Sequence, residues 1–125
     1  MKKSSSLWKQ TDKLCGEVTR LRDRGKCRLC GSLGTDSHHI VPRSYTSTTF
    51  LPANRLWLCR TCHNHDDIEL QTKCIQEIGE KEYQRLWLIA RFVTQFRHAD
   101  LISIRDTLKR AVSTFGENEH FKGYL

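Results

Sequence analysis

Three segments decide the fold of this chain: Cys27-Arg28-Leu29-Cys30, His38-His39-Ile40-Val41-Pro42-Arg43 and Asn54-Arg55-Leu56-Trp57-Leu58-Cys59-Arg60-Thr61-Cys62-His63-Asn64. Two Cys-x-x-Cys pairs bracket a histidine pair, an asparagine and a third histidine. Between residues 26 and 63 the apolar residues lose their helical spacing, and glycine and proline punctuate the chain. We expect this stretch to be rich in loops, and a loop-rich centre in a small domain benefits from a metal staple.

The four cysteines of the two pairs have the spacing of a closed zinc site. Zinc prefers four tetrahedral sulfur or nitrogen ligands, and each Cys-x-x-Cys loop brings two thiolates to one ion. One structural Zn2+ is therefore predicted on Cys27, Cys30, Cys59 and Cys62. Unrelated buried cysteines, a disulfide and a redox role are the alternatives. The remaining two cysteines, Cys15 and Cys74, are expected to be semi-buried, unreactive thiols.

Length and charge narrow the class of protein. A chain of 125 residues supports one domain, 1–125, rather than two. Its formal net charge is +7, and residues 1–28 carry nine basic side chains against three acidic ones. This balance favours a polyanionic partner, with nucleic acid ahead of an acidic membrane. The sequence shows neither a secretory leader nor a membrane-spanning apolar run, so we expect a cytoplasmic location, where cysteines stay reduced and metal binding is favoured over a disulfide.

Apolar spacing outside the motif predicts helices on both sides of it. One helix is expected at about 7–24, within a basic N-terminal segment, 6–25. Two short strands are expected at about 37–41 and 55–58, joined by a loop. Three helices follow at about 63–78, 80–97 and 100–113, and the last two form a C-terminal segment, 80–115. The predicted fold class is a small α+β domain whose centre, 26–70, is framed by the cysteines.

The histidines are spaced to do chemistry beside the cysteines. His38 and His39 are adjacent on an extended segment, so their side chains are expected on opposite faces. One can bind a metal while the other faces an attacking water. His63 follows Cys62 at the start of a predicted helix. Asp67 comes one turn later on the same helical face, where it could add an oxygen ligand.

Taken together, these residues resemble the HNH endonuclease family, with its ββα-metal motif framed by a four-cysteine zinc site. The resemblance rests on the two Cys-x-x-Cys pairs, on 38–43 and on 54–64, about the central third of the chain. It implies that the two strands and the helix after them form a ββα-metal core. The N-terminal helix and the C-terminal helices would flank that core.

The resemblance also implies a role for each matching residue. His39 is similar to the general base, which takes a proton from water as it attacks phosphorus. His38 and His63 resemble two ligands of a single catalytic divalent ion, and Asp67 occupies the position of a third. Asn54 resembles the residue that orients the base histidine and braces the loop.

The implied activity is metal-dependent hydrolysis of DNA phosphodiester bonds, by nicking or double-strand cleavage, with 5′-phosphate and 3′-hydroxyl products. Mg2+ or Mn2+ is the expected catalytic ion, and a histidine-rich shell would also accept Ni2+, Co2+ or Zn2+. Arg43 and Arg60 flank the motif and are candidates to hold phosphate oxygens.

Other functions stay open beside this one. A non-catalytic, zinc-stabilised nucleic-acid-binding module is one, and within nucleases an endonuclease for branched recombination DNA is another. The small size suits a phage or mobile-element protein, which would act in the host cytoplasm. Double-strand cleavage needs two active sites, so a homodimer is expected in that case, with Trp87 and Phe92 as candidate interface residues. No membrane partner is expected.

Overall fold

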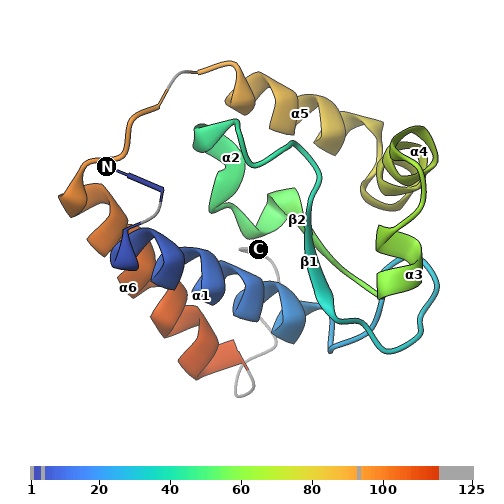
Figure 1. Ribbon diagram of the computed structural model, residues 1–125, viewed down its shortest axis with the longest axis horizontal. Helices are drawn as coiled ribbons and strands as arrows, with labels where there is room; N and C mark the ends of the chain where they lie inside the picture. The colour runs from blue at the N-terminus through green and yellow to red at the C-terminus, as the bar shows by residue number, and fades with distance from the viewer. Residues whose placement is uncertain (1, 4, 93, 116–125) are drawn as a thin grey trace.

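The N-terminal helix forms as α1, Ser6–Arg22, in the computed structural model of the protein, which describes residues 2–3, 5–92 and 94–115 (Figure 1). It begins where the Ser5 hydroxyl accepts a hydrogen bond from the Trp8 amide, 3.1 Å away. It ends near Gly25, as expected, because Gly25 adopts a φ of 70° and its amide bonds back to the Arg20 carbonyl.

The C-terminal helix α6, His98–Phe115, packs against α1, and Figure 1 shows the two side by side. Their contact buries Cys15 and Val18 of α1 against Leu108 and Ala111 of α6. The helix is longer by two residues at each end than predicted. Its apolar stripe is nevertheless the predicted one, with Leu101 and Leu108 buried.

The two predicted strands pair into an antiparallel sheet, β1 (Asp36–His39) with β2 (Arg55–Leu58). The register sets His38 opposite Leu56 and His39 opposite Arg55. Directly paired residues share a face of a sheet, so Leu56 and His38 lie on one face and Arg55 and His39 on the other. β1 stops two residues earlier than expected because Val41 is held by the Asn54 side chain rather than by a ladder.

The segment between the strands is more ordered than the predicted loop. It contains a one-turn helix, α2 (Thr46–Thr49), and a 3-10 turn, η1 (Pro52–Asn54). Thr48 and Thr49 are buried.

The single helix predicted at 63–78 is two helices, α3 (Arg60–His63) and α4 (Asp67–Ile78). The break occurs because the Asp66 side chain caps a new helix by accepting a hydrogen bond from the Glu69 amide at 2.9 Å. His63 therefore ends a helix instead of starting one. Gly79, with a φ of 92°, separates α4 from α5 (Glu80–Ala90), as predicted.

Helix α5 ends at Ala90, seven residues before the predicted boundary at 97. The Ser47 hydroxyl donates to the Ile89 carbonyl, and the Thr46 hydroxyl donates to the Thr94 carbonyl, so α2 satisfies carbonyl groups where α5 stops. Phe96, which falls within the predicted helix 80–97, lies beyond the end of α5 and packs against Trp8 and Phe50. Val93, also within that predicted helix, lies outside the described residues.

The main core lies between the sheet and the helices α4 and α5, while α1 contacts the sheet from its other face (Figure 1). Leu56 and Leu58 of β2 enter this core together with Leu70, Cys74 and Leu86. The architecture is a small, mostly helical α+β fold. No helix within the described ranges is long and apolar enough to cross a membrane.

Candidate functional site

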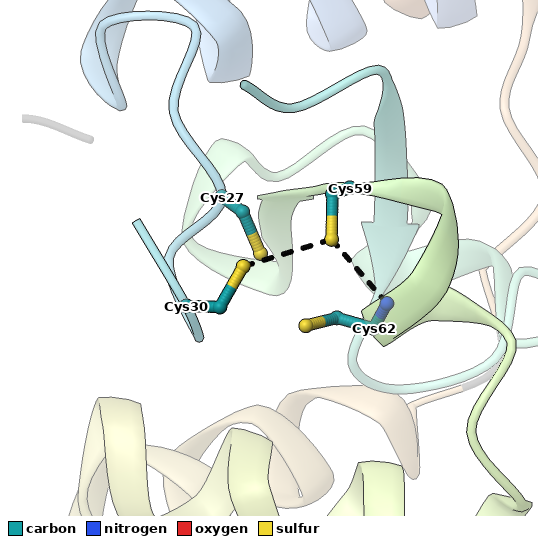
Figure 2. Close-up of side chains that lie close together, drawn as sticks. All are labelled: Cys27, Cys30, Cys59 and Cys62. Atoms are coloured by element: carbon teal, nitrogen blue, oxygen red, sulfur yellow. Dashed lines mark hydrogen bonds between the residues drawn. The ribbon is translucent and has the colours of Figure 1, made fainter. Parts of the chain in front are cut away.

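The four cysteines of the two pairs gather at one point, as the spacing predicted (Figure 2). Their sulfur atoms all lie within 4.8 Å of one another, and the Sγ atoms of Cys30 and Cys59 are 3.7 Å apart. Four sulfurs at about 2.3 Å from a tetrahedral zinc would be about 3.8 Å apart. The cluster therefore fits a structural zinc ion, which all four thiolates would hold.

The protonation behaviour of the cysteines also fits a cation at the centre. A hydrogen bond with Ser32 lowers the pKa of the Cys30 thiol to about 6. Burial and the neighbouring sulfurs raise the pKa of Cys62 to about 12. Four adjacent thiols cannot all ionise unless a cation compensates their charge, so the arrangement favours metal binding over free thiols. By contrast, Cys15 and Cys74 are buried elsewhere, and burial raises the pKa of each to about 11, as expected for unreactive thiols.

A buried carboxylate, Asp23, connects the first cysteine pair to the rest of the fold. Its oxygens accept hydrogen bonds from Arg22 and Arg28 and from the Trp57 amide of β2. Its side chain is only 1% exposed. Asp23 thus joins the end of α1, the first Cys-x-x-Cys pair and the strand β2, which leads into the second Cys-x-x-Cys pair. Sequence reasoning treated it only as a charge opposing the basic residues.

One face of β1 carries an arrangement of two imidazoles and a carboxylate. The rings of His38 and His63 meet edge to face with centroids 5.1 Å apart. The Nδ1 atom of His63 lies 2.8 Å from Oδ2 of Asp36. Burial, and then the charge of His63, lower the pKa of His38 to about 4, so its ring is neutral at pH 7 and able to bind a metal.

Asp36 is the residue of this site that sequence reasoning missed. The signal was the alternation of the strand, because a residue two positions before His38 shares its face. Partial burial alone would raise the pKa of Asp36, but hydrogen bonds from His63 and Arg60 lower it below its ordinary value. The carboxylate is therefore charged at neutral pH.

The other face of β1 carries His39 in a cleft beneath α1. The cleft has a volume of about 310 Å³, and its lining includes Lys13, Arg43 and Trp57. Among the described residues, two buried side-chain nitrogens lack a hydrogen-bond partner, Nε2 of His39 and Nε1 of Trp57, and both residues line this cleft. A buried polar group without a partner calls for an explanation, and a catalytic role or a bound water or ion is among the explanations.

The electrostatic surroundings keep His39 neutral. Burial, together with the charge of the paired Arg55, lowers the pKa of His39 to about 3. Arg55 is itself 2% exposed and bonds to Asp12 of α1 and to the Thr49 carbonyl. The helix α1 is in this way fastened to the strand opposite His39.

Asn54 is fully buried and braces the turn that follows β1. Its Oδ1 accepts a hydrogen bond from the Val41 amide at 2.8 Å, and its Nδ2 donates to the Val41 carbonyl at 3.0 Å. The Asn54 carbonyl also accepts from the Ile40 amide at 2.8 Å. All three bonds fix the backbone immediately after His39.

Three further residues were predicted to belong to the site: Asp67, Arg60 and Arg43. Asp67 was expected on the same helical face as His63, but the two residues belong to different helices. It lines a hollow of about 320 Å³ together with His38. Arg60 is bonded to Asp36, and Arg43 is exposed beside His39. Within the described part of the chain, the cysteines alone form a close group of three or more metal-binding side chains.

The structure therefore presents two sites of different character. The four cysteines could together hold a metal ion, whereas His38 and His63 are two facing imidazoles, of which His38 lines the hollow of about 320 Å³. Comparisons with protein-family models, with curated proteins and with solved structures returned no match for this chain.

Proposed function

We propose that the protein is a metal-dependent endonuclease of the HNH type that hydrolyses phosphodiester bonds in DNA. The observation that carries the proposal is the arrangement on β1. Two facing imidazoles, His38 and His63, lie on one face of the strand, and His39 lies on the other face with an unpartnered nitrogen. A structural zinc cluster holds the segments that carry these residues.

His39 acts in this proposal as the general base. A pKa of about 3 leaves its imidazole unprotonated at neutral pH, so it can accept a proton from water. A base with so low a pKa is weak in the free protein. Part of the lowering comes from Arg55 and Arg43, and a phosphate in the cleft would offset their charge. Substrate binding would in this way raise the proton affinity of the base.

His38 and His63 hold the catalytic divalent ion in this proposal. The fit rests on two imidazole rings that face each other, with Nδ1 of His63 engaged by Asp36. Mg2+ or Mn2+ is the proposed ion, and Ni2+, Co2+ or Zn2+ would also suit imidazole ligands. When bound, a divalent ion would polarise the phosphate and stabilise the 3′ oxygen as it leaves.

The free edge of β1 explains how one phosphodiester could contact both faces of the strand. The sheet has two strands, so among the described residues β1 pairs on one side only, with β2. A backbone crossing the open edge would meet His39 on one face and the His38–His63 pair on the other. Lys13 and Arg43 beside His39 would bind phosphate oxygens, in keeping with the net charge of +7.

A non-catalytic nucleic-acid-binding module is the competing function. The basic charge and the cysteine cluster are equally consistent with a binding module. It gives no reason, however, for a neutral histidine with a buried unpartnered nitrogen next to a facing pair of imidazoles.

The test is a plasmid assay with the zinc-loaded protein. Supercoiled DNA is incubated with Mg2+, Mn2+, Ni2+ or EDTA, and nicked and linear products are separated. Cleavage that requires a divalent ion and disappears in EDTA is expected. Nicked product alone would indicate one active site acting at a time, and linear product would indicate a pair, as in a homodimer.

A second substrate set separates specificity from lack of activity. If the plasmid is untouched by every ion, the same assay uses branched duplexes such as four-way junctions. Cleavage of those alone would support the branched-DNA endonuclease. Binding of all substrates without cleavage of any would overturn the nuclease proposal in favour of the binding module.

A further inference from the structure

We propose that Asp36 is a positioning residue that fixes the tautomer and orientation of His63 for metal binding. This inference rests on the proposed function, because it concerns the ion that His38 and His63 would hold. Asp36 lies on the same face of β1 as His38, and its Oδ2 is 2.8 Å from Nδ1 of His63.

In its charged form, a carboxylate can accept hydrogen bonds but cannot donate them. The Nδ1 atom of His63 is therefore the donor in this contact, and in a neutral ring this arrangement leaves the Nε2 lone pair free. A metal-binding histidine commonly donates its other ring N–H to a carboxylate, and this contact fixes the ring and makes it a better ligand. Asp36 has the geometry of such a partner.

The other contacts of Asp36 argue against its being a metal ligand itself. Arg60 forms an ion pair with Asp36, its Nε atom lying 2.9 Å from Oδ2, and a terminal nitrogen donates a hydrogen bond to Oδ1 at 3.0 Å. The Thr35 hydroxyl donates to Oδ1 at 3.1 Å. With the His63 contact, Asp36 accepts three hydrogen bonds and has one further ion-pair contact, so both of its oxygens are engaged. An ion would have to displace one of these contacts.

The same contacts redefine the role predicted for Arg60. Its side chain is 71% exposed, but its guanidinium forms an ion pair with Asp36 and donates one hydrogen bond to it. Arg60 therefore holds the carboxylate in place from the solvent side. His63 occupies the inner side of the same carboxylate, with its side chain 35% exposed.

The experiment compares Asp36→Ala and Asp36→Glu with Thr35→Ala in the full-length, zinc-loaded protein. Thr35→Ala is the matched control, because it removes one hydrogen bond to Asp36 and leaves the His63 contact intact. Nitrogen-15 NMR of the imidazoles reports the His63 tautomer before any divalent ion is added. Titration with Mn2+, followed by the EPR signal of the free ion, reports the affinity of the second site.

In wild type and Thr35→Ala we expect His63 to be protonated on Nδ1 and Mn2+ affinities to agree within about twofold. Asp36→Ala should lose the Nδ1–H preference and weaken Mn2+ binding by about 10–100-fold, and Asp36→Glu should restore part of both. A circular-dichroism spectrum and one retained zinc per chain would show that the variants fold.

Two results would overturn the inference, and they can be told apart. If wild-type protein binds Mn2+ and cleaves DNA, and Asp36→Ala keeps its tautomer and affinity, the role of Asp36 is wrong and the nuclease stands. If wild-type protein binds no Mn2+ beyond its zinc and cleaves nothing, the proposed function fails and the inference fails with it.

Discussion

At the scale of single residues, hydrogen-bonding capacity explains why Asn54 can be fully buried beside the site. An amide side chain offers both a donor and an acceptor, and Asn54 uses one of each on the backbone of Val41. No apolar side chain could form hydrogen bonds with the Val41 amide and carbonyl in that turn. The asparagine of the motif is in this view needed first for the backbone shape that follows His39.

Asn54→Ala should therefore destabilise the protein more than an exposed truncation would. It leaves the Val41 amide and carbonyl without partners, and we expect a loss of roughly 2–4 kcal/mol in the free energy of unfolding. Urea denaturation measures the loss. Asn64→Ala, at an exposed position, is the matched control and should change stability by no more than about 0.5 kcal/mol. Equal effects of the two variants would contradict the bracing role.

At the scale of elements, the fold depends on polar ties between segments that are far apart in sequence. Asp23 joins α1, the first Cys-x-x-Cys pair and β2, and Arg55 joins β2 to α1. Sequence spacing predicted the two strands and the existence of the long helices α1, α5 and α6, because glycine stops and apolar stripes are local signals, but it predicted neither α2 and η1 nor the separation of α3 from α4. It could not predict Asp23 or Asp36, because a carboxylate reveals its role only when its distant donors are known.

Asp23→Asn should destabilise the protein at neutral pH by about 3 kcal/mol, because it leaves the partly buried Arg22 and Arg28 without the counter-charge of the buried Asp23 carboxylate. Burial raises the pKa of Asp23, but its hydrogen bonds with Arg22, Trp57 and Arg28 outweigh that and lower it. The native pKa is therefore below the unfolded value of about 3.9. The stabilisation is complete above about pH 4 and is lost as pH falls through the native pKa.

Chemical denaturation across a pH series measures this effect. The stability difference between wild type and Asp23→Asn should be constant near pH 7 and shrink below about pH 4. Glu82→Gln is the control, since it breaks an exposed ion pair with Arg85 and should cost less than about 1 kcal/mol. A difference that stays constant down to pH 2 would show that the charge of Asp23 is unimportant.

The cysteine cluster connects the segment after α1 with α3, so removal of a bound zinc should loosen the end of the sheet where β1 begins and β2 ends. We expect one zinc per chain by elemental analysis, and chelation should lower the melting temperature. Cys62→Ser should lose the zinc, while Cys15→Ser, at an equally buried position outside the cluster, should keep it. Zinc retained by Cys62→Ser would contradict the four-ligand site.

At the scale of the whole molecule, the sequence predicted which faces are buried but not what covers them. The stripes of α1 and α6 were visible as apolar spacing, yet nothing local indicated that these two helices, at opposite ends of the described chain, pack on each other. The early end of α5 could not be predicted from local sequence either, because the hydroxyl groups that bond to the carbonyls at its end come from α2. The division of the predicted helix at His63 depended on a single cap, Asp66.

Leu108→Ala tests the contact between the two terminal helices. Leu108 is 5% exposed within the α1–α6 cluster, so its truncation should cost about 2–4 kcal/mol in the free energy of unfolding. Leu88→Ala, at a site 56% exposed on α5, is the matched control and should cost less than about 1 kcal/mol. Thermal and urea denaturation give both values. Similar losses in the two variants would mean that α6 is not docked as described.

The whole account depends on His39 acting as a base rather than as a packed side chain. The most direct measurement is the initial rate of supercoiled-plasmid loss for wild type and His39→Ala in Mg2+ or Mn2+. DNA affinity in EDTA and the melting temperature are recorded for both proteins. We predict a rate at least about 100-fold lower in the variant, with DNA affinity and fold retained. A variant that cleaves DNA at the wild-type rate would contradict the proposed mechanism.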